Sequence, residues 1–83
     1  MTTLELNRNL GTQPLDAIME GRGLTNHALV AASDEGITHK MVQRARKGRM
    51  LTRNAQEKVL RALNRAVPEQ AFERQELFTY PGC

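Results

Sequence analysis

The chain has 83 residues, enough for one small domain but too few for a multidomain enzyme, because a chain of this length buries only about 60 to 65% of its unfolded surface. Hydrophobic residues make up 40% of it and charged residues 25%, a globular balance that favours neither wholesale disorder nor a fibrous repeat. The net charge is +3, and the few aromatic residues, with no tryptophan, leave an aliphatic core that suits packed helices.

Residues 1–13 are expected to form an N-terminal arm whose structure the sequence leaves open. Three leucines spaced among polar residues fit a short strand, a segment packed on the core, or a flexible arm.

The first helix is predicted over residues 14–21. Pro14 suits a first helical turn, apolar residues recur at helical spacing, and Gly21 lies at the predicted end of the helix.

Three pairs of an apolar residue followed by threonine predict the starts of three further helices. The threonine hydroxyl accepts a hydrogen bond from an unpaired N–H in the first turn of a helix. The pairs are Leu24-Thr25, Ile37-Thr38 and Leu51-Thr52. We expect helices over about residues 26–34, 39–47 and 53–66. Gly36 is expected to make the turn between the first two, and Gly48 to end the second.

Residues 67–83 are predicted to form a C-terminal helix and tail. Val67-Pro68 breaks the preceding helix, and Pro68 suits the first position of a fifth helix. Three large apolar residues follow, which either cover the core or contact another subunit: Phe72, Leu77 and Phe78. Residues 79–83 are expected to be a loose tail.

Positive charge is concentrated in one stretch of the chain. Between Ile37 and Gln56 there are six cationic residues and no acid: Lys40, Arg44, Arg46, Lys47, Arg49 and Arg53. Solvated helices usually alternate charge signs to gain ion pairs four residues apart. A block of one sign therefore indicates an anionic partner, and a phosphate backbone is the obvious candidate.

The order of helices resembles the lambda-repressor-like family of phage repressor and Cro-type proteins, over about residues 14–66. Ala32, Gly36 and Val42 have helix-turn-helix spacing, in which a small residue lets the helices approach, glycine makes the turn and valine anchors the recognition helix. The basic-glycine-basic run at residues 46–49 also matches. The predicted fold is therefore all-α, a compact bundle of four to five short helices containing a helix-turn-helix.

Two alignments with this family stay open at the turn. Aligned on Leu24, Leu29 and Ile37, the turn is about two residues longer than the family usually has. Aligned on Gly36, the spacing fits, but Glu35 occupies a position that is normally apolar. The choice changes which side chains face the DNA groove.

The resemblance implies that the helix at residues 39–47 enters the major groove. On its outward side lie the predicted base-contacting residues, His39, Lys40 and Gln43, of which Gln43 best suits adenine. Predicted contacts to the DNA backbone come from helix starts and cations: Thr25, Asn26, Thr38, Arg44, Arg46, Lys47, Arg49 and Arg53. Family members commonly pair through the C-terminal helix, which implies a homodimer with Phe72, Leu77 and Phe78 as its dimerisation patch.

We expect a cytoplasmic protein with no catalytic site, cofactor or metal. The longest apolar run is far short of the roughly 18 residues that cross a bilayer, and the N-terminus lacks the apolar segment of a secretory signal. Cys83 is the only cysteine, and no nucleophile motif or phosphate-binding glycine loop is present. His27 and His39 are twelve residues apart without other ligands at suitable spacing, so a zinc site is not expected.

The predicted function is sequence-specific binding of double-stranded DNA, by a small prokaryotic or phage regulator of transcription. The alternative is a helical protein-interaction module, an adaptor or antitoxin-like protein whose partner is another protein. The fold alone does not separate the two, because function depends on the site. The acid-free basic stretch favours nucleic acid.

Overall fold

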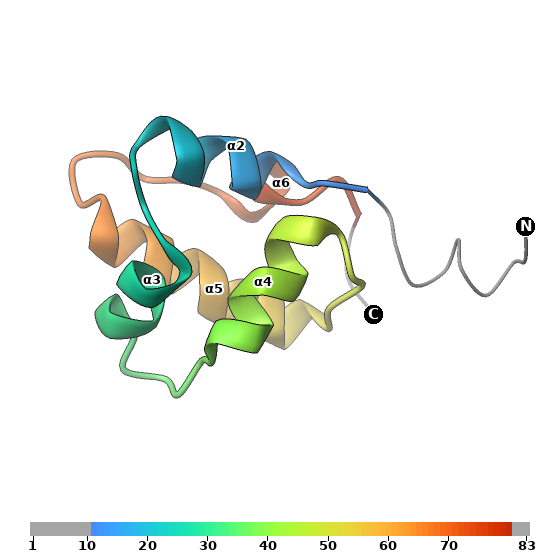
Figure 1. Cartoon of the computed structure of the whole chain (residues 1–83), viewed down its shortest axis with the longest axis horizontal. Coiled ribbons are helices and arrows are strands. Elements are labelled where there is room, and N and C mark those ends of the chain that lie inside the picture. Colours follow the sequence, from blue (N-terminus) through green and yellow to red (C-terminus); the bar gives the residue numbers. More distant parts are fainter. Residues whose placement is uncertain (1–10, 81–83) are drawn as a thin grey trace, which may run out of the picture.

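The structure is a computed structural model that describes residues 11–80, and it is all-α, as predicted (Figure 1). Its helices are α2 (Pro14–Gly21), α3 (Asn26–Ala32), α4 (His39–Lys47), α5 (Arg53–Ala66) and α6 (Arg74–Leu77). The predicted bounds of the first four are confirmed to within two residues. The expectations for the arm over residues 1–10 and for the tail over residues 81–83, with Cys83, fall outside the described residues.

Helix α5 is the element on which most of the bundle packs. Val59, Ala62 and Leu63 on its broad apolar face are completely or almost completely buried, and the helix contacts α3, α4 and α6. Figure 1 shows α5 running behind α3 and α4, with α2 and α6 above them. The broad face therefore makes α5 the central packing helix of the described residues.

The three predicted threonine caps are confirmed. Each threonine hydroxyl accepts a hydrogen bond from the backbone N–H three residues later, at 3.1 Å: Thr25 from Ala28, Thr38 from Met41 and Thr52 from Ala55. A side-chain cap satisfies one N–H that the first helical turn leaves unpaired. Three helix starts are thus set by local chemistry.

The prediction that Pro68 opens a fifth helix is wrong, because residues 67–70 form a turn and Asn64 on α5 holds the backbone of Phe72 just after it. The Asn64 side chain accepts a hydrogen bond from the backbone N–H of Phe72 at 2.8 Å and donates one to the carbonyl of Phe72 at 3.2 Å. The helix begins only at α6, where Glu73 and Glu76 form a capping box. Residues 67–73 therefore connect α5 to α6 without forming a helix.

The predicted dimerisation patch is also wrong, since Phe72, Leu77 and Phe78 belong to the core of their own chain. Their exposed fractions are 8%, 0% and 3%. Of the two roles left open for these residues, they cover the core. Burial of side chains of this size contributes about 1.5 to 3 kcal/mol each to the free energy of unfolding. The C-terminal segment is therefore an integral part of the bundle.

The chain is not loose at residues 79 and 80, contrary to expectation. The backbone N–H and the hydroxyl of Thr79 both donate to Oε1 of Gln13, at 2.7 and 3.0 Å, and Gln13 is buried. The hydroxyl of Tyr80 donates to the carbonyl of Arg49 at 3.1 Å and accepts from the N–H of Leu51 at 3.0 Å. These bonds fix both the start of the bundle and the α4–α5 loop.

Gly48 ends α4 at a close backbone crossing. It has a φ of +93°, and a Cβ placed on it would lie 1.9 Å from the carbonyl oxygen of Gly11. Gly21, at the end of α2, has no positive φ and open space around its Cα. The two helix-terminal glycines therefore differ in both backbone conformation and available space.

Replacing Gly48 with alanine is expected to lower the free energy of unfolding by more than about 1 kcal/mol, because the methyl group meets backbone and the left-handed conformation disfavours it. Urea denaturation measures the change. Gly21→Ala is the matched control and should be neutral or stabilise by about 0.5 to 1 kcal/mol. Equal effects of the two substitutions would contradict the close approach at Gly48.

Candidate nucleic-acid interface

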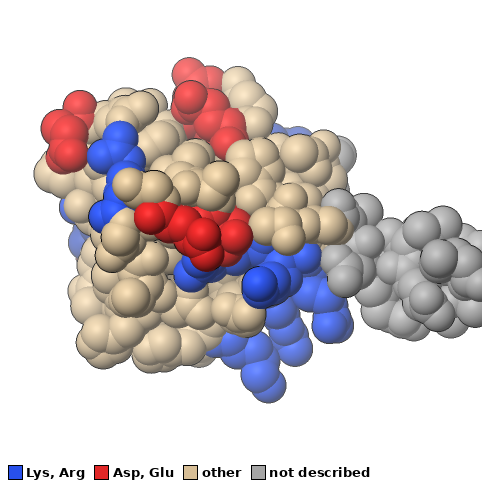
Figure 2. Space-filling view, turned by 45° about the horizontal axis from the view of Figure 1, so that its top comes forward, with Lys and Arg blue, Asp and Glu red and all other residues tan. Residues whose placement is uncertain are grey.

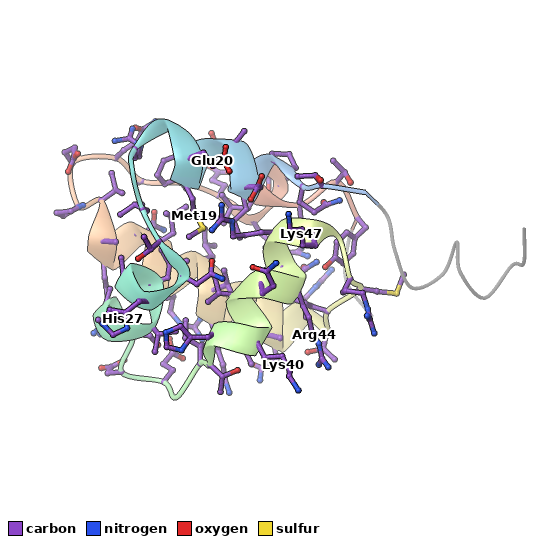
Figure 3. All side chains as sticks on the ribbon, viewed as in Figure 1. Met19, Glu20, His27, Lys40, Arg44 and Lys47 are labelled. Carbon is purple, nitrogen blue, oxygen red and sulfur yellow. The ribbon has the colours of Figure 1, made fainter. Side chains whose placement is uncertain are left out.

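Helix α4 has a buried side and an exposed polar side. Val42 and Ala45 are completely buried, which seats the helix on the bundle. The exposed residues are those predicted to contact DNA: His39, Lys40, Gln43, Arg44 and Lys47. Figure 3 shows Lys40 and Arg44 extending from α4 away from the bundle, with Lys47 near the C-terminal end of the helix. The predicted outward face of this helix is therefore exposed.

Positive charge continues past the end of α4. Arg49 follows Gly48, Arg53 begins α5, and both are exposed. Within residues 11–80, no acid forms an ion pair with the five exposed cations of the basic stretch, which are Lys40, Arg44, Lys47, Arg49 and Arg53. Figure 2 shows lysine and arginine side chains gathered along the lower edge of the molecule, where this view shows no acid. We call these five residues the basic row.

Arg46 is the sixth cation of the stretch, and its predicted contact with the DNA backbone is wrong. Its side chain is only 14% exposed. It donates to Oδ1 of Asp16 on α2 at 2.6 Å and to Oδ1 of Asn26 on α3 at 2.7 Å, and Glu20 lies 3.7 Å away. Because Arg46 lies on the side of α4 that faces α2, it joins three helices instead of facing outward.

Asn26 connects Arg46 to the residue best suited to reading a base. While its side-chain oxygen accepts from Arg46, its Nδ2 donates to Oε1 of Gln43 at 2.9 Å. Both ends of the Asn26 amide are thus engaged within the protein, so its side chain positions Gln43. Sequence reasoning placed Asn26 at a phosphate and missed this bond, since the two residues lie 17 positions apart.

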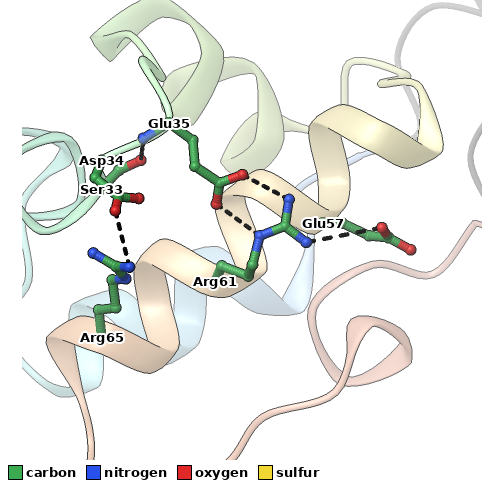
Figure 4. A network of polar contacts seen from close by, with 6 residues as sticks. All are labelled: Ser33, Asp34, Glu35, Glu57, Arg61 and Arg65. Atoms are coloured by element: carbon green, nitrogen blue, oxygen red, sulfur yellow. Dashed lines mark hydrogen bonds and ion pairs between the residues drawn. The ribbon is translucent and has the colours of Figure 1, made fainter.

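The connection between α3 and α4, residues 33–38, is braced against α5 by ion pairs (Figure 4). Glu35 accepts two hydrogen bonds from Arg61, at 2.6 and 2.7 Å, and Asp34 pairs with Arg65 at 3.1 Å. The hydrogen bonds from Arg61 hold the pKa of the Glu35 carboxyl below its usual value. At Gly36 the backbone takes a φ of +75°, which confirms the predicted turn.

The ion pair with Arg61 explains how an acidic side chain is accommodated in a partly buried part of this connection. The Glu35 side chain is partly buried, with 27% exposure, and its charge is matched by a planar guanidinium in a two-bond arrangement. Such bidentate pairs are geometrically specific. The ion pairs therefore fix the course of the chain that leads into α4.

His39, a predicted base-contacting residue, lies against His27 of α3. The ring atoms His27 Nδ1 and His39 Nε2 are 3.4 Å apart. Among the described residues, no group of three or more histidine, cysteine or acidic side chains is arranged to hold a metal ion. The sequence did not predict this contact between the two histidines, because it depends on the packing of the helices and on the geometry of the turn between them.

Comparisons of the chain with protein-family models, with curated proteins and with solved structures found no match. None of the helices within residues 11–80 has the length and apolar character needed to cross a membrane. The use of the exposed α4 face must therefore be argued from its own residues and their contacts.

Arg46→Met is expected to lower the free energy of unfolding by about 1 to 3 kcal/mol, because it leaves Asp16 and Asn26 without their partner while keeping an apolar stem. Arg44→Met, on the exposed side of the same helix, should change it by no more than about 0.5 kcal/mol. Urea denaturation of both variants tests the assignment. A similar small effect at both positions would show that the Arg46 bonds contribute little.

The contribution of the Glu35–Arg61 pair should depend on pH. Because folding lowers the pKa of Glu35 from about 4.5, its stabilising effect is present above that value and is lost as the pH falls through the lower pKa of the folded state. The wild-type protein should therefore melt above Glu35→Gln at pH 7, and the gap should close as the solution is acidified. A gap that is the same at every pH would mean that charge is not its source.

Proposed function

We propose that this protein binds double-stranded DNA through α4 and regulates transcription. The observation that carries the proposal is the basic row, five exposed cations whose charges no acid within residues 11–80 pairs with. Phosphates are the anionic groups that such a row fits, and neutralising them releases counterions. The proposal is for a cytoplasmic protein that regulates the transcription of a prokaryotic or phage genome.

The α3–α4 pair supports a helix-turn-helix reading of this surface. The two helices contact one another, Gly36 turns the chain between them, and Val42 anchors α4 in the core. The six-residue connection is longer than the usual turn of three to four residues. The Arg61 and Arg65 ion pairs supply the rigidity that a shorter turn has by itself. On these grounds we propose a relationship to the lambda-repressor-like family.

Within this proposal, Gln43 reads a base and the basic row contacts phosphates. An amide oxygen has two lone pairs, so Gln43 Oε1 can keep its bond from Asn26 and accept a second from adenine, to which Nε2 donates. Lys40 and His39 reach neighbouring base edges from the first turn of α4. Lys47, Arg49 and Arg53 contact the backbone where α4 leaves the groove, which positions the protein without specifying sequence.

The test is selection of bound fragments from a random duplex pool, followed by titration of the selected duplex at two salt concentrations. We expect one enriched sequence and an affinity that falls steeply with salt. Two inverted half-sites about one helical turn apart would mean that two copies bind, and a single site would mean one. Weak binding to every duplex without enrichment would overturn the proposal and favour the protein-interaction alternative.

Two substitutions on α4 should separate specificity from affinity. Gln43→Ala is expected to relax the preference at one base position by about 1 to 3 kcal/mol, whereas Lys47→Ala should weaken all sequences alike and reduce the salt slope by about 1. Lys58→Ala is the matched control, because Lys58 is a cation on α5 that does not belong to the basic row, and this variant should bind like the parent. If both α4 variants bound DNA with the affinity and sequence preference of the parent, α4 would not contact the DNA.

A further inference from the structure

Two exposed histidines from different helices meet at the starts of α3 and α4. His27 is the second residue of α3 and His39 is the first residue of α4. Their ring nitrogens, Nδ1 of His27 and Nε2 of His39, are 3.4 Å apart, and the ring centroids are 5.5 Å apart with an interplanar angle of 20°. The folded protein thus brings together two good metal ligands that are twelve residues apart in sequence.

The separation of the two nitrogens suits a shared metal ion better than a shared proton. Hydrogen bonds from N–H to oxygen are commonest near 2.9 to 3.0 Å, and by that standard a ring-to-ring contact at 3.4 Å is long for a hydrogen bond. Zinc–imidazole bonds measure about 2.0 to 2.1 Å, and at a tetrahedral angle two such bonds place their nitrogens about 3.3 to 3.4 Å apart. The pair therefore already has the spacing of two ligands on one tetrahedral ion.

The backbone that carries the two rings is held in place by neighbouring contacts. The caps at Thr25 and Thr38 fix the two helix starts, and the Asn26–Gln43 bond joins the same two helices. Glu35, in the connection between them, is held by Arg61. A pair of ligands on fixed helices loses little freedom when an ion binds, and this favours binding.

We propose that His27 and His39 bind a divalent transition-metal ion through their ring nitrogens, and that this ion is Zn²⁺. Imidazole nitrogen is a preferred ligand of zinc, whereas magnesium and calcium prefer oxygen. Two protein ligands leave the remaining positions to water, so the ion is exchangeable and is not required for folding. This site is proposed on grounds separate from the proposed DNA binding, although both would use His39 at one end of the same face.

The test is titration of the full chain with zinc chloride in the absence of DNA, in a Cys83→Ser background that removes the only thiol. The two rings adjoin only in the folded state, so zinc should raise the melting temperature. Shifts of the two histidine ring signals in the NMR spectrum should saturate at one ion per chain. Magnesium chloride should produce neither effect, because it prefers oxygen ligands.

His27→Gln and His39→Gln, each in the same background, are the deciding variants. Both residues are exposed, and melting without metal establishes that each variant is folded. We expect each substitution alone to abolish the zinc-induced rise, since a single imidazole cannot chelate. No rise in the Cys83→Ser parent, or a rise that persists in either histidine variant, would overturn the proposal. Because no DNA is present, neither result bears on DNA binding.

Discussion

The candidate surface depends on one guanidinium group. Arg46 projects from α4 toward the bundle, where it donates to Asp16 of α2 and Asn26 of α3, so three helices are oriented by one side chain. Charged hydrogen bonds of this kind, in a partly buried setting, are among the stronger polar contacts in proteins. Through Asn26 the same contact reaches Gln43. The interior side of α4 thereby sets the position of a side chain on its exterior side.

A second set of charges, on the opposite side of α3 and α4, holds the connection between these helices. Loops usually have weak packing and varied conformations, and a six-residue connection without such contacts would leave the position of α4 poorly defined. The ion pairs of Arg61 with Glu35 and of Arg65 with Asp34 tie this segment to α5, the helix that contacts α3, α4 and α6. Arg46 and Arg61 therefore both fix the position of α4. Arg46 does so through α2 and α3, and Arg61 through the connection that precedes α4.

Helix positions could be predicted from the sequence because their causes are local. A threonine hydroxyl caps the helix beside it, and a glycine such as Gly36 turns the chain where it stands. The contacts that failed prediction join distant residues: Asp16 and Arg46 are 30 positions apart, and Gln13 and Thr79 are 66 apart. Burial of Phe72 likewise depends on Asn64 and on how α5 packs. Exposure of a side chain follows from periodicity, but its partner follows only from the assembled fold.

The distribution of ion pairs explains why the basic row keeps its charge. Asp16, Asp34 and Glu35 all pair with arginines that brace helices: Arg46, Arg65 and Arg61. Glu69 pairs with Arg22 at the far end of α2. Acids placed beside Lys40 or Lys47 would add local ion pairs worth only a few tenths of a kcal/mol each, yet they would cancel the positive charge of this face. Acids in this bundle thus stabilise its frame, while the exposed side of α4 stays positive within the described residues.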